Sequence, residues 1–212
     1  NATGTVLRKN INTYVTDNSE APFVGWNYRY LSQVQGYIRT GTSLLLTSKT
    51  IYVNDPGNGN LLLKQDYLGG SIYRKEAFEY STMPALSASY VLDRPVRRTL
   101  MSANNTILSE AYYEYSPKGN IVLLKNVLYA GQNTNTSDAA YSYDGYGNVK
   151  EMKVCQEYGT MSTPASGSCM VTTTSYDAES QTFPLSVMTP LGVTKAKYLI
   201  KLGVPYESTD VN

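Results

Sequence analysis

Apolar and polar residues alternate over short stretches of this chain, and glycine, asparagine or proline separates one stretch from the next. In residues 26–31, for example, the alternation puts Trp26, Tyr28 and Tyr30 on one face of an extended strand. No stretch repeats its apolar residues at the spacing of a long amphipathic helix. The pattern therefore predicts an all-β fold, an antiparallel meander of tyrosine-rich β-hairpins.

The strands that this pattern predicts are short. They cover residues 5–8, 12–16, 26–31, 36–40, 42–47, 50–54, 61–66, 87–92, 107–115, 121–129, 141–144, 148–155, 170–176, 182–188 and 193–200. Residues 73–80 fit either a strand or a single helical turn, and residues 131–138 are expected to form a polar loop. The strongest predicted turn is at residues 55–60, where proline and glycine punctuate the chain.

One nine-residue pattern occurs twice, at residues 113–121 and 141–149. It reads Tyr-x-Tyr-(Asp or Ser)-x-x-Gly-Asn-(Val or Ile), in which two tyrosines share a strand face and the residues after them favour a turn. Because Ser116 takes the place of Asp144 in the first copy, we interpret Asp144 as a turn former and not as a catalytic acid. Residues 59–61 resemble the end of a degenerate third copy.

The amino-acid composition limits the kinds of catalytic and binding site that this chain can form. Twenty tyrosines accompany only three phenylalanines, and an apolar ring with a polar tip suits half-buried sheet faces. Histidine is absent, which excludes Ser-His-Asp and Cys-His catalysis within this chain and removes the commonest zinc ligand. Charge is nearly balanced, and we expect the only basic cluster, Arg94, Arg97 and Arg98, to be a solvated strand face. We predict no nucleic-acid partner, no membrane span and no cofactor or metal.

Cys155 and Cys169 enclose a short stretch rich in Gly, Ser, Thr and Pro. No CxxC spacing or histidine partner indicates a metal or redox site. In an exported protein, a disulfide here would stabilise the fold by about 3 kcal/mol, whereas a cytosolic protein would keep two buried thiols. We favour the disulfide, because the enclosed residues contain little apolar material that could order them otherwise.

The repeat resembles the YD-repeat, also called the RHS repeat, which is named for a Tyr-Asp dipeptide followed by Gly-Asn or Gly-Arg. Residues 143–148 fit that pattern fully, whereas Ser116 departs from it. Residues 175–194 look like the Tyr-Asp…Phe-Pro…Pro-Leu-Gly-x-Thr stretch of large bacterial RHS proteins, particularly the B-component of insecticidal toxin complexes. The residues that carry the resemblance are Tyr113, Tyr115, Gly119, Asn120, Tyr141, Tyr143, Asp144, Gly147, Asn148, Tyr176, Asp177, Phe183, Pro184, Pro190, Leu191 and Gly192.

The resemblance implies a fold and a structural role rather than a reaction. In that family the repeats form a β-sheet ribbon that curves into a hollow shell, which in toxin-associated members encloses a toxic polypeptide. The self-cleaving aspartate motif of the family's core is not recognisable here, so we carry over no catalytic residue. We expect a single all-β repeat region over residues 1–212, with degenerate repeats at 1–110, clearer ones at 111–200 and a tail at 201–212.

The same resemblance leads us to expect a piece of a longer chain that is secreted or lies at the cell surface. Its expected partners are neighbouring repeats of the parent chain or another copy joined through strand edges. An enclosed toxin or a host surface is a further expected partner. We expect no catalysis by this chain itself.

Two other functions fit the sequence. Exposed tyrosines and Trp26 can serve an extracellular binding or adhesion module that recognises glycan or a host protein, and a contiguous exposed aromatic patch would favour it. Glycoside hydrolysis needs only two carboxylates, although acids scattered on strands are normally solvated. The carboxylates available for it are Asp66, Glu76, Glu79, Glu110 and Glu114.

Overall fold

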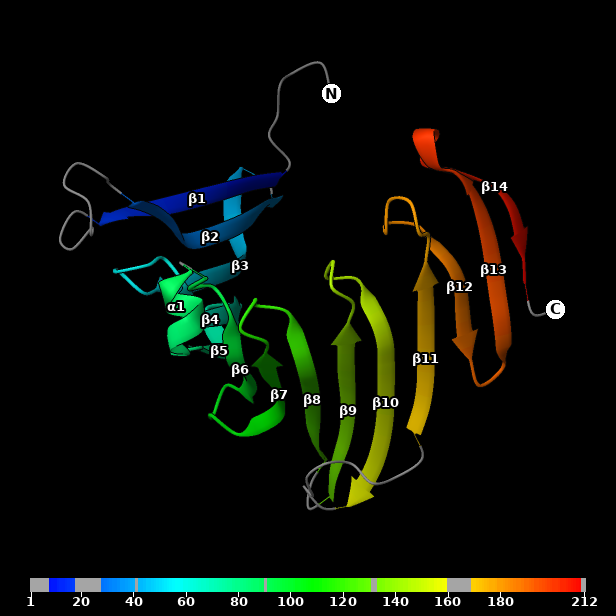
Figure 1. Cartoon of the computed structure of the whole chain (residues 1–212). Helices are drawn as coiled ribbons and strands as arrows, with labels where there is room; N and C mark the ends of the chain where they lie inside the picture. The colour runs from blue at the N-terminus through cyan, green and yellow to red at the C-terminus, as the bar shows by residue number, and fades with distance from the viewer. Residues whose placement is uncertain are drawn as a thin grey trace. The chain divides into compact units, whose positions relative to one another are not determined.

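The computed structural model describes residues 8–17, 28–40, 42–89, 91–130, 133–159 and 169–210. Within them, 14 β-strands are hydrogen-bonded to one another in chain order, from β1 to β14 (Figure 1). Every strand pair whose register is described is antiparallel. The all-β meander predicted from the alternation is therefore confirmed. The chain divides into two compact units, Asn1–Glu110 and Ala111–Asn212, and the boundary falls within β7 (Ile107–Tyr115).

The predicted strands of the first unit are longer than the sequence pattern indicates, and one further strand, β6 (Pro95–Ser102), lies where the pattern predicts no strand. Their bounds are β1 Arg8–Asp17, β2 Tyr28–Thr40, β3 Ser43–Asn54, β4 Leu61–Leu68, β5 Ser71–Tyr80 and β6 Pro95–Ser102. Residues 28–31 of the strand predicted at 26–31 and the whole strand predicted at 36–40 belong to β2, while residues 26 and 27 lie outside the described residues. A register shift between Gly36 and Tyr37 marks an irregularity there that bends the strand without ending it.

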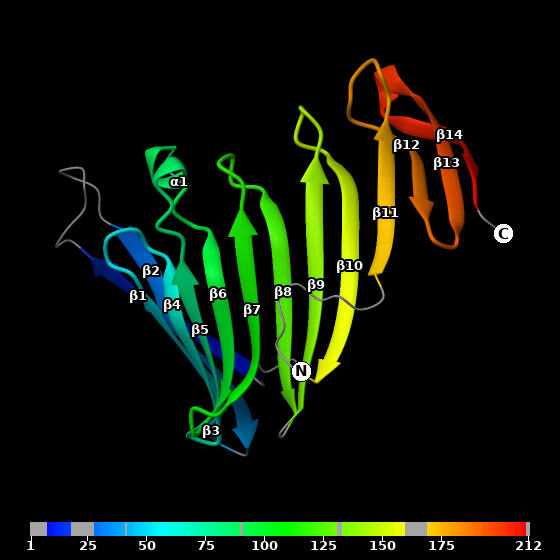
Figure 2. The same ribbon diagram turned by 60° about the horizontal axis from the view of Figure 1, so that its bottom comes forward.

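A short helix, α1 (Pro84–Ala88), interrupts the first unit between β5 and β6. Figure 2 shows it beyond the ends of those two strands. The strand predicted at residues 87–92 is therefore wrong. Pro84 fits the first turn of a helix, where no backbone donor is needed, and Leu86 is only 1% exposed. Five residues are too few for helical periodicity to be visible in the sequence. Residues 73–80, which fitted either element, form part of β5.

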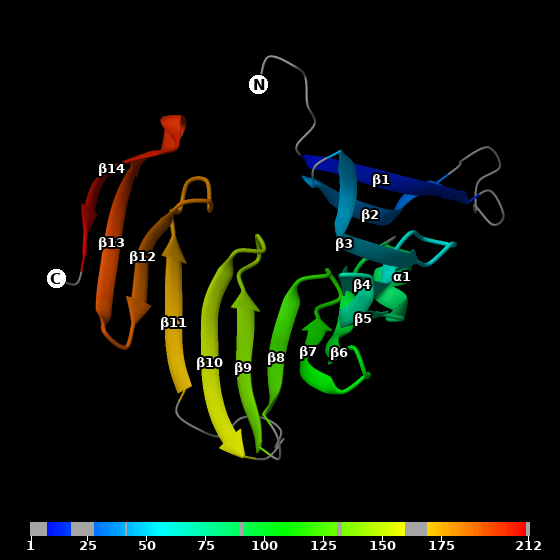
Figure 3. The same cartoon turned by 180° about the vertical axis from the view of Figure 1, so that it is seen from behind.

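The second unit continues the meander (Figure 3). Its elements after β7 are β8 Ile121–Ala130, β9 Asn133–Tyr143, β10 Val149–Gly159, β11 Cys169–Tyr176, β12 Pro184–Thr189, β13 Gly192–Leu199, a 3₁₀ turn η1 Ile200–Leu202 and β14 Val204–Thr209.

One prediction for the second unit is wrong. Most of the expected polar loop at residues 131–138 belongs to β9, because pairing with both β8 and β10 overrides the weak strand propensity of its asparagines. The expected tail at residues 201–212 contains β14, which pairs with β13.

Polar groups take up much of the interior. Among the described residues, Leu86 and Val127 are the large side chains that are almost completely buried. The buried charged residues are Asp66, Glu76, Glu110, Lys125, Asp138 and Asp177. Since a buried charge is costly unless it is paired or hydrogen-bonded, these residues and their partners determine how the strands fit together.

Candidate functional site

The two copies of the repeat form the same turn. In the first copy the Ser116 amide donates to the Asn120 carbonyl at 2.8 Å, and the Asn120 amide donates to Ser116 Oγ at 3.2 Å. In the second, the Asp144 amide donates to the Asn148 carbonyl at 3.0 Å, and the Asn148 amide donates to Asp144 Oδ1 at 2.9 Å. Gly119 and Gly147 take φ values of 82° and 94°, which side chains rarely adopt. Serine and aspartate therefore act interchangeably as the acceptor that closes the turn.

The turn aspartate of the second copy is held in its charged form. Burial raises the pKa of the Asp144 carboxyl, but hydrogen bonds from the Asn148 side chain and from the amides of Asn148, Tyr146 and Gly147 outweigh it. The net pKa of Asp144 is lower than its usual value. This supports the interpretation of Asp144 as a turn former, because a general acid needs a proton near neutral pH.

A longer version of the turn begins at Asp177, a residue that is 3% exposed. The Asp177 amide donates to the Phe183 carbonyl at 3.0 Å, and Oδ1 accepts from the amides of Thr182 and Phe183 at 2.8 and 2.7 Å. Oδ2 accepts from the amide and the hydroxyl of Ser180 at 2.5 and 2.9 Å. Burial raises the pKa of Asp177, but these hydrogen bonds, led by that from Phe183, hold it well below its usual range.

Replacing Asp177 by asparagine is expected to change how stability depends on pH. A carboxyl whose pKa is lowered by folding stabilises the fold above its unfolded pKa of about 3.9, and this stabilisation is lost as the pH falls below that value. The Asp177→Asn protein should therefore be less stable than the original at pH 7, and the difference should shrink below about pH 4. Urea midpoints across that range measure this. Glu179→Gln, an exposed change in the same turn, is the control, and an equal difference at all pH values would contradict the role of Asp177.

Two further turns share this construction. At residues 55–60 the Asp55 amide donates to the Asn60 carbonyl at 2.7 Å, and Gly59 has a φ of 79°. A side chain at Gly59 would also lie 2.8 Å from the ring of Tyr30. At residues 102–106 the Ser102 amide donates to the Thr106 carbonyl at 2.9 Å. The sequence pattern missed that last turn because Asn105, with a φ of 64°, takes the place of glycine.

Tyrosine hydroxyls join neighbouring hairpins at the ends where these turns lie. Tyr80, the last residue of β5, donates to the carbonyl of Leu61, the first residue of β4, at 3.0 Å. The same contact joins Tyr143 to Ile121 at 2.7 Å and Tyr176 to Val149 at 3.0 Å. We call Tyr80, Tyr143 and Tyr176 the linking tyrosines. Burial raises the pKa of the Tyr80 and Tyr143 hydroxyls, which keeps them protonated as donors.

The strand register explains why tyrosine occurs at these positions. In four strand pairs, the third residue of an even-numbered strand is the first one that pairs with the next odd-numbered strand. These first pairs are Leu63 with Ala77, Leu123 with Ala140, Glu151 with Thr173 and Ser186 with Lys195. Three residues after each odd-strand partner stands a tyrosine: Tyr80, Tyr143, Tyr176 or Tyr198. The hydroxyls of Tyr80, Tyr143 and Tyr176 reach the first residue of the even strand, which forms no backbone pair with the odd strand.

Strand irregularities help to aim these tyrosines. The register of the odd strand against the following even strand shifts directly before Tyr80, Tyr176 and Tyr198. Such a shift re-aims the next side chain. The asparagine that ends a turn adds a second link, since Asn60 Nδ2 donates to the Leu92 carbonyl at 2.6 Å and Asn148 Nδ2 to the Gln181 carbonyl at 2.5 Å.

The last repeat turn uses an apolar contact instead. Phe183 stands where Asn148 stands in the second copy, and its ring stacks on Tyr198 with centroids 5.0 Å apart. Pro184 then begins β12. Pro190 and Leu191 form the turn that follows β12, Leu191 is 88% exposed, and Gly192 begins β13.

The remaining tyrosines of the repeat lie on strands. The rings of Tyr113 and Tyr115 are stacked with centroids 6.5 Å apart, and Tyr141 is half-buried on β9 opposite Met152.

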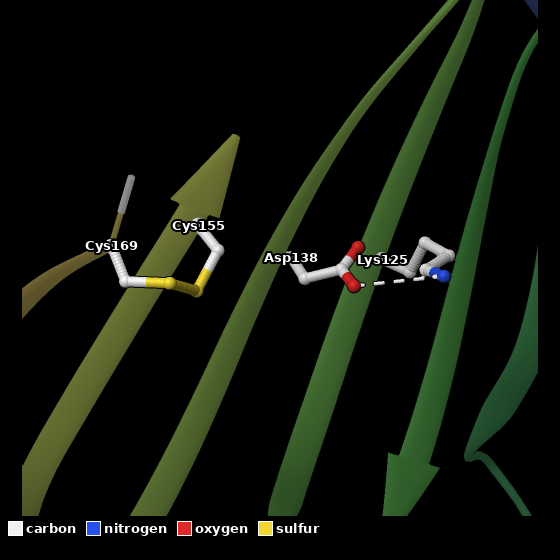
Figure 4. Close-up of a disulfide and its surroundings, with 4 residues drawn as sticks. All are labelled: Lys125, Asp138, Cys155 and Cys169. Atoms are coloured by element: carbon white, nitrogen blue, oxygen red, sulfur yellow. Dashed lines mark ion pairs between the residues drawn. A yellow bond between two sulfur atoms is a disulfide. The ribbon is translucent and has the colours of Figure 1, made fainter. Parts of the chain in front are cut away.

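A row of polar and sulfur-containing side chains crosses β8 to β11. Lys125 lies opposite Asp138, Asp138 opposite Cys155, and Cys155 opposite Cys169. Figure 4 shows the Cys155–Cys169 disulfide beside the Lys125–Asp138 ion pair, whose Nζ–Oδ2 distance is 3.5 Å. The predicted disulfide is therefore confirmed. It ties the last register pair of β10 and β11.

Ion pairs cross the strands of the first unit. Asp66 binds Arg74 at 2.7 Å and Lys64 at 3.3 Å, Arg98 binds Glu76, and Arg97 binds Glu110 and, at 2.9 Å, Glu79. Burial raises the pKa of Asp66, but the hydrogen bonds from Arg74, Thr50 and Lys64 together lower it by more. The net pKa of Asp66 is therefore below its usual value. The expected solvated face of Arg97 and Arg98 is thus an ion-pair surface, and four of the five candidate carboxylates lie within it.

Exposed aromatic side chains are scattered. Among tyrosines whose burial is described, Tyr14, Tyr73, Tyr146 and Tyr206 are exposed, and they lie on β1, on β5, in the second-copy turn and on β14. Trp26 lies outside the described residues. A groove of about 330 Å³ in the second unit is lined by serines and threonines of β9 to β12 with Lys150, Glu151 and Met188.

The described residues contain no cluster of three or more Cys, Asp or Glu side chains that could hold a metal ion. No helix among them has both the length and the apolar character that crossing a bilayer requires.

A scan against protein-family models gives no match, and a search of curated proteins gives none either. Among solved structures, the chain is similar to a porin-like protein from Bacteroides uniformis, with 11% sequence identity and a TM-score of 0.40. The alignment covers 98% of this chain and 90% of that one. At this TM-score the likeness supports no inference about function.

Proposed function

We propose that this chain is a structural wall segment of a YD-repeat (RHS-type) protein, a β-ribbon that is secreted or displayed at the cell surface. The observation that carries the proposal is the linking tyrosine. At three joints, a tyrosine at the end of an odd-numbered strand donates its hydroxyl to the carbonyl of the first residue of the even-numbered strand before it. The two strands belong to neighbouring hairpins. A contact repeated at fixed register joins similar hairpins in a row, which is what a wall requires.

Other features fit this role. Most tyrosines with described burial are buried or half-buried against the sheet, and a disulfide suits an extracellular setting. An enclosed toxic polypeptide is the cargo that the family resemblance suggests. The role requires no catalysis by this chain. The alternative, a binding module for glycan or a host protein, gains no support from four exposed tyrosines on separate elements.

The proposal predicts that the linking hydroxyls stabilise the second unit. Replacing Tyr143 or Tyr176 by phenylalanine removes only the hydroxyl and should lower the free energy of unfolding by about 1 kcal/mol each. Amide hydrogen exchange should also accelerate at the starts of β8 and β10, where the two carbonyl acceptors lie.

The matched control is Tyr146→Phe, which changes a 75% exposed ring in the second-copy turn. It should alter stability by less than about 0.5 kcal/mol. If Tyr143→Phe and Tyr176→Phe behaved like this control, the hydroxyl contacts would not hold the hairpins together and the proposed role would lose its basis.

A further inference from the structure

Two strands of the sheet have one described neighbour each. β1 pairs with β2 and β14 pairs with β13, so each presents one edge without a partner among the described residues. All six residues of β14 are exposed. Backbone groups on such edges can pair with a strand from another chain.

Tyr14 on β1 shares features with the linking tyrosines, although three further residues of β1 follow it, and it has no hydrogen-bond acceptor among the described residues. It lies on an odd-numbered strand, and the register against β2 shifts directly before it, as it does before Tyr80, Tyr176 and Tyr198. Its side chain is 57% exposed, and the strand that would carry its acceptor is not among the described neighbours of β1.

β14 has the complementary attributes. It is an even-numbered strand that begins directly after a turn, and its first residue, Val204, occupies the place of Leu61, Ile121 and Val149. Its second residue is Pro205, which lacks a backbone donor. At the other joints the second residue of the even strand forms no pair with the next strand, so proline at this place does not obstruct pairing.

We infer that β1 of one copy pairs with β14 of a second copy, with the Tyr14 hydroxyl bound to the backbone carbonyl of Val204. This inference rests on the proposed function, since it uses the same contact. The spacing found at the four internal joints fixes the register. The third residue of β14, Tyr206, lies opposite Ile11, three residues before Tyr14.

The resulting interface agrees with two other observations. Within the sheet, each odd-numbered strand whose register is described runs antiparallel to the even-numbered strand before it. Placing β1 of one copy after β14 of the other continues this antiparallel order. The register also places the basic Arg8 and Lys9 diagonally across from Glu207, which pairs with Lys197, and Asp210, so the charges on the two edges are complementary. Because the two edges differ, the contact is head-to-tail and adds copies one after another.

Sedimentation velocity of the 212-residue chain over a range of concentrations tests this inference. We expect the average mass to rise with concentration. Tyr14→Phe should weaken association by about two- to tenfold, as expected for the loss of one hydrogen bond. Tyr73→Phe, which changes another exposed tyrosine of the first unit, should leave it unchanged. A monomer at all concentrations would overturn the inference, and association indifferent to Tyr14→Phe would overturn the role of Tyr14.

Cross-linking tests the register. Ile11→Cys and Tyr206→Cys proteins, mixed and oxidised, should form a mixed disulfide dimer, because directly opposite residues have the required Cβ separation. Ile11→Cys mixed with Glu207→Cys should give much less, and equal yields would contradict the register. If Tyr143→Phe destabilises the monomer but no association occurs, only this inference fails. If Tyr143→Phe has no effect, the proposed function fails as well.

Discussion

Replacing Lys125 by methionine is expected to destabilise the second unit by about 3–5 kcal/mol. The Lys125 and Asp138 side chains are 9% and 6% exposed, and the two residues face each other directly on β8 and β9. Methionine keeps most of the volume but leaves the Asp138 carboxylate buried without its cation. The cost of an uncompensated buried charge far exceeds that of losing an exposed ion pair, which is typically below about 1 kcal/mol.

A double variant separates the two causes of this loss. Lys125→Met combined with Asp138→Leu removes both charges, and we expect it to recover most of the lost stability, because apolar replacements of a buried pair are often neutral or better. Urea unfolding of the single and double variants gives the comparison. Lys197→Met, which breaks an exposed pair with Glu207, is the control for the methionine itself. A double variant as unstable as the single one would show that packing, not charge, causes the loss.

Replacing Leu86 by alanine is expected to cost about 2–5 kcal/mol in the first unit. Leu86 is 1% exposed although it belongs to a helix of only five residues. Its buried side chain therefore holds the segment between β5 and β6 against the rest of the first unit. Alanine would leave a cavity and would remove the main apolar group that holds α1 in place. Loss of α1 would also disturb the Leu92 carbonyl, which accepts from the Asn60 side chain.

The measurement is urea unfolding together with hydrogen exchange of β4 and β5. Leu68→Ala provides the matched control, because that leucine is 66% exposed and its truncation should change stability by less than about 0.5 kcal/mol. Equal effects of the two substitutions would mean that the helix is only loosely attached.

How far the sequence predicts this structure depends on how local each interaction is. The turns at Ser116 and Asp144 were predictable because acceptor, glycine and asparagine lie within five residues of one another. The disulfide was predictable from the scarcity of other ordering residues between Cys155 and Cys169. The same local rule missed the turn at Ser102, where asparagine replaces glycine at a positive φ.

Interactions between distant residues were not predictable. The linking role of Tyr143 depends on Ile121, 22 residues away, and on a register that only the assembled strands define. Residues 133–138 lack the composition of a strand and become one because β8 and β10 flank them. Residues 87–92 looked like a strand because a single helical turn, here α1, leaves no periodic signature. Nothing in the sequence pairs Lys125 with Asp138, since the ion pair follows from the alignment of two neighbouring strands.

The roles of odd-numbered and even-numbered strands at the three tyrosine joints have a geometric consequence. The hydroxyl comes from an odd-numbered strand and its carbonyl acceptor from the even-numbered strand before it. Removing or duplicating a single strand would reverse chain direction at the next joint and would bring together two strands of the same kind. Removing or duplicating two consecutive strands preserves every other joint. A change of length that keeps these contacts therefore adds or removes two strands at a time, which makes the hairpin the repeating unit.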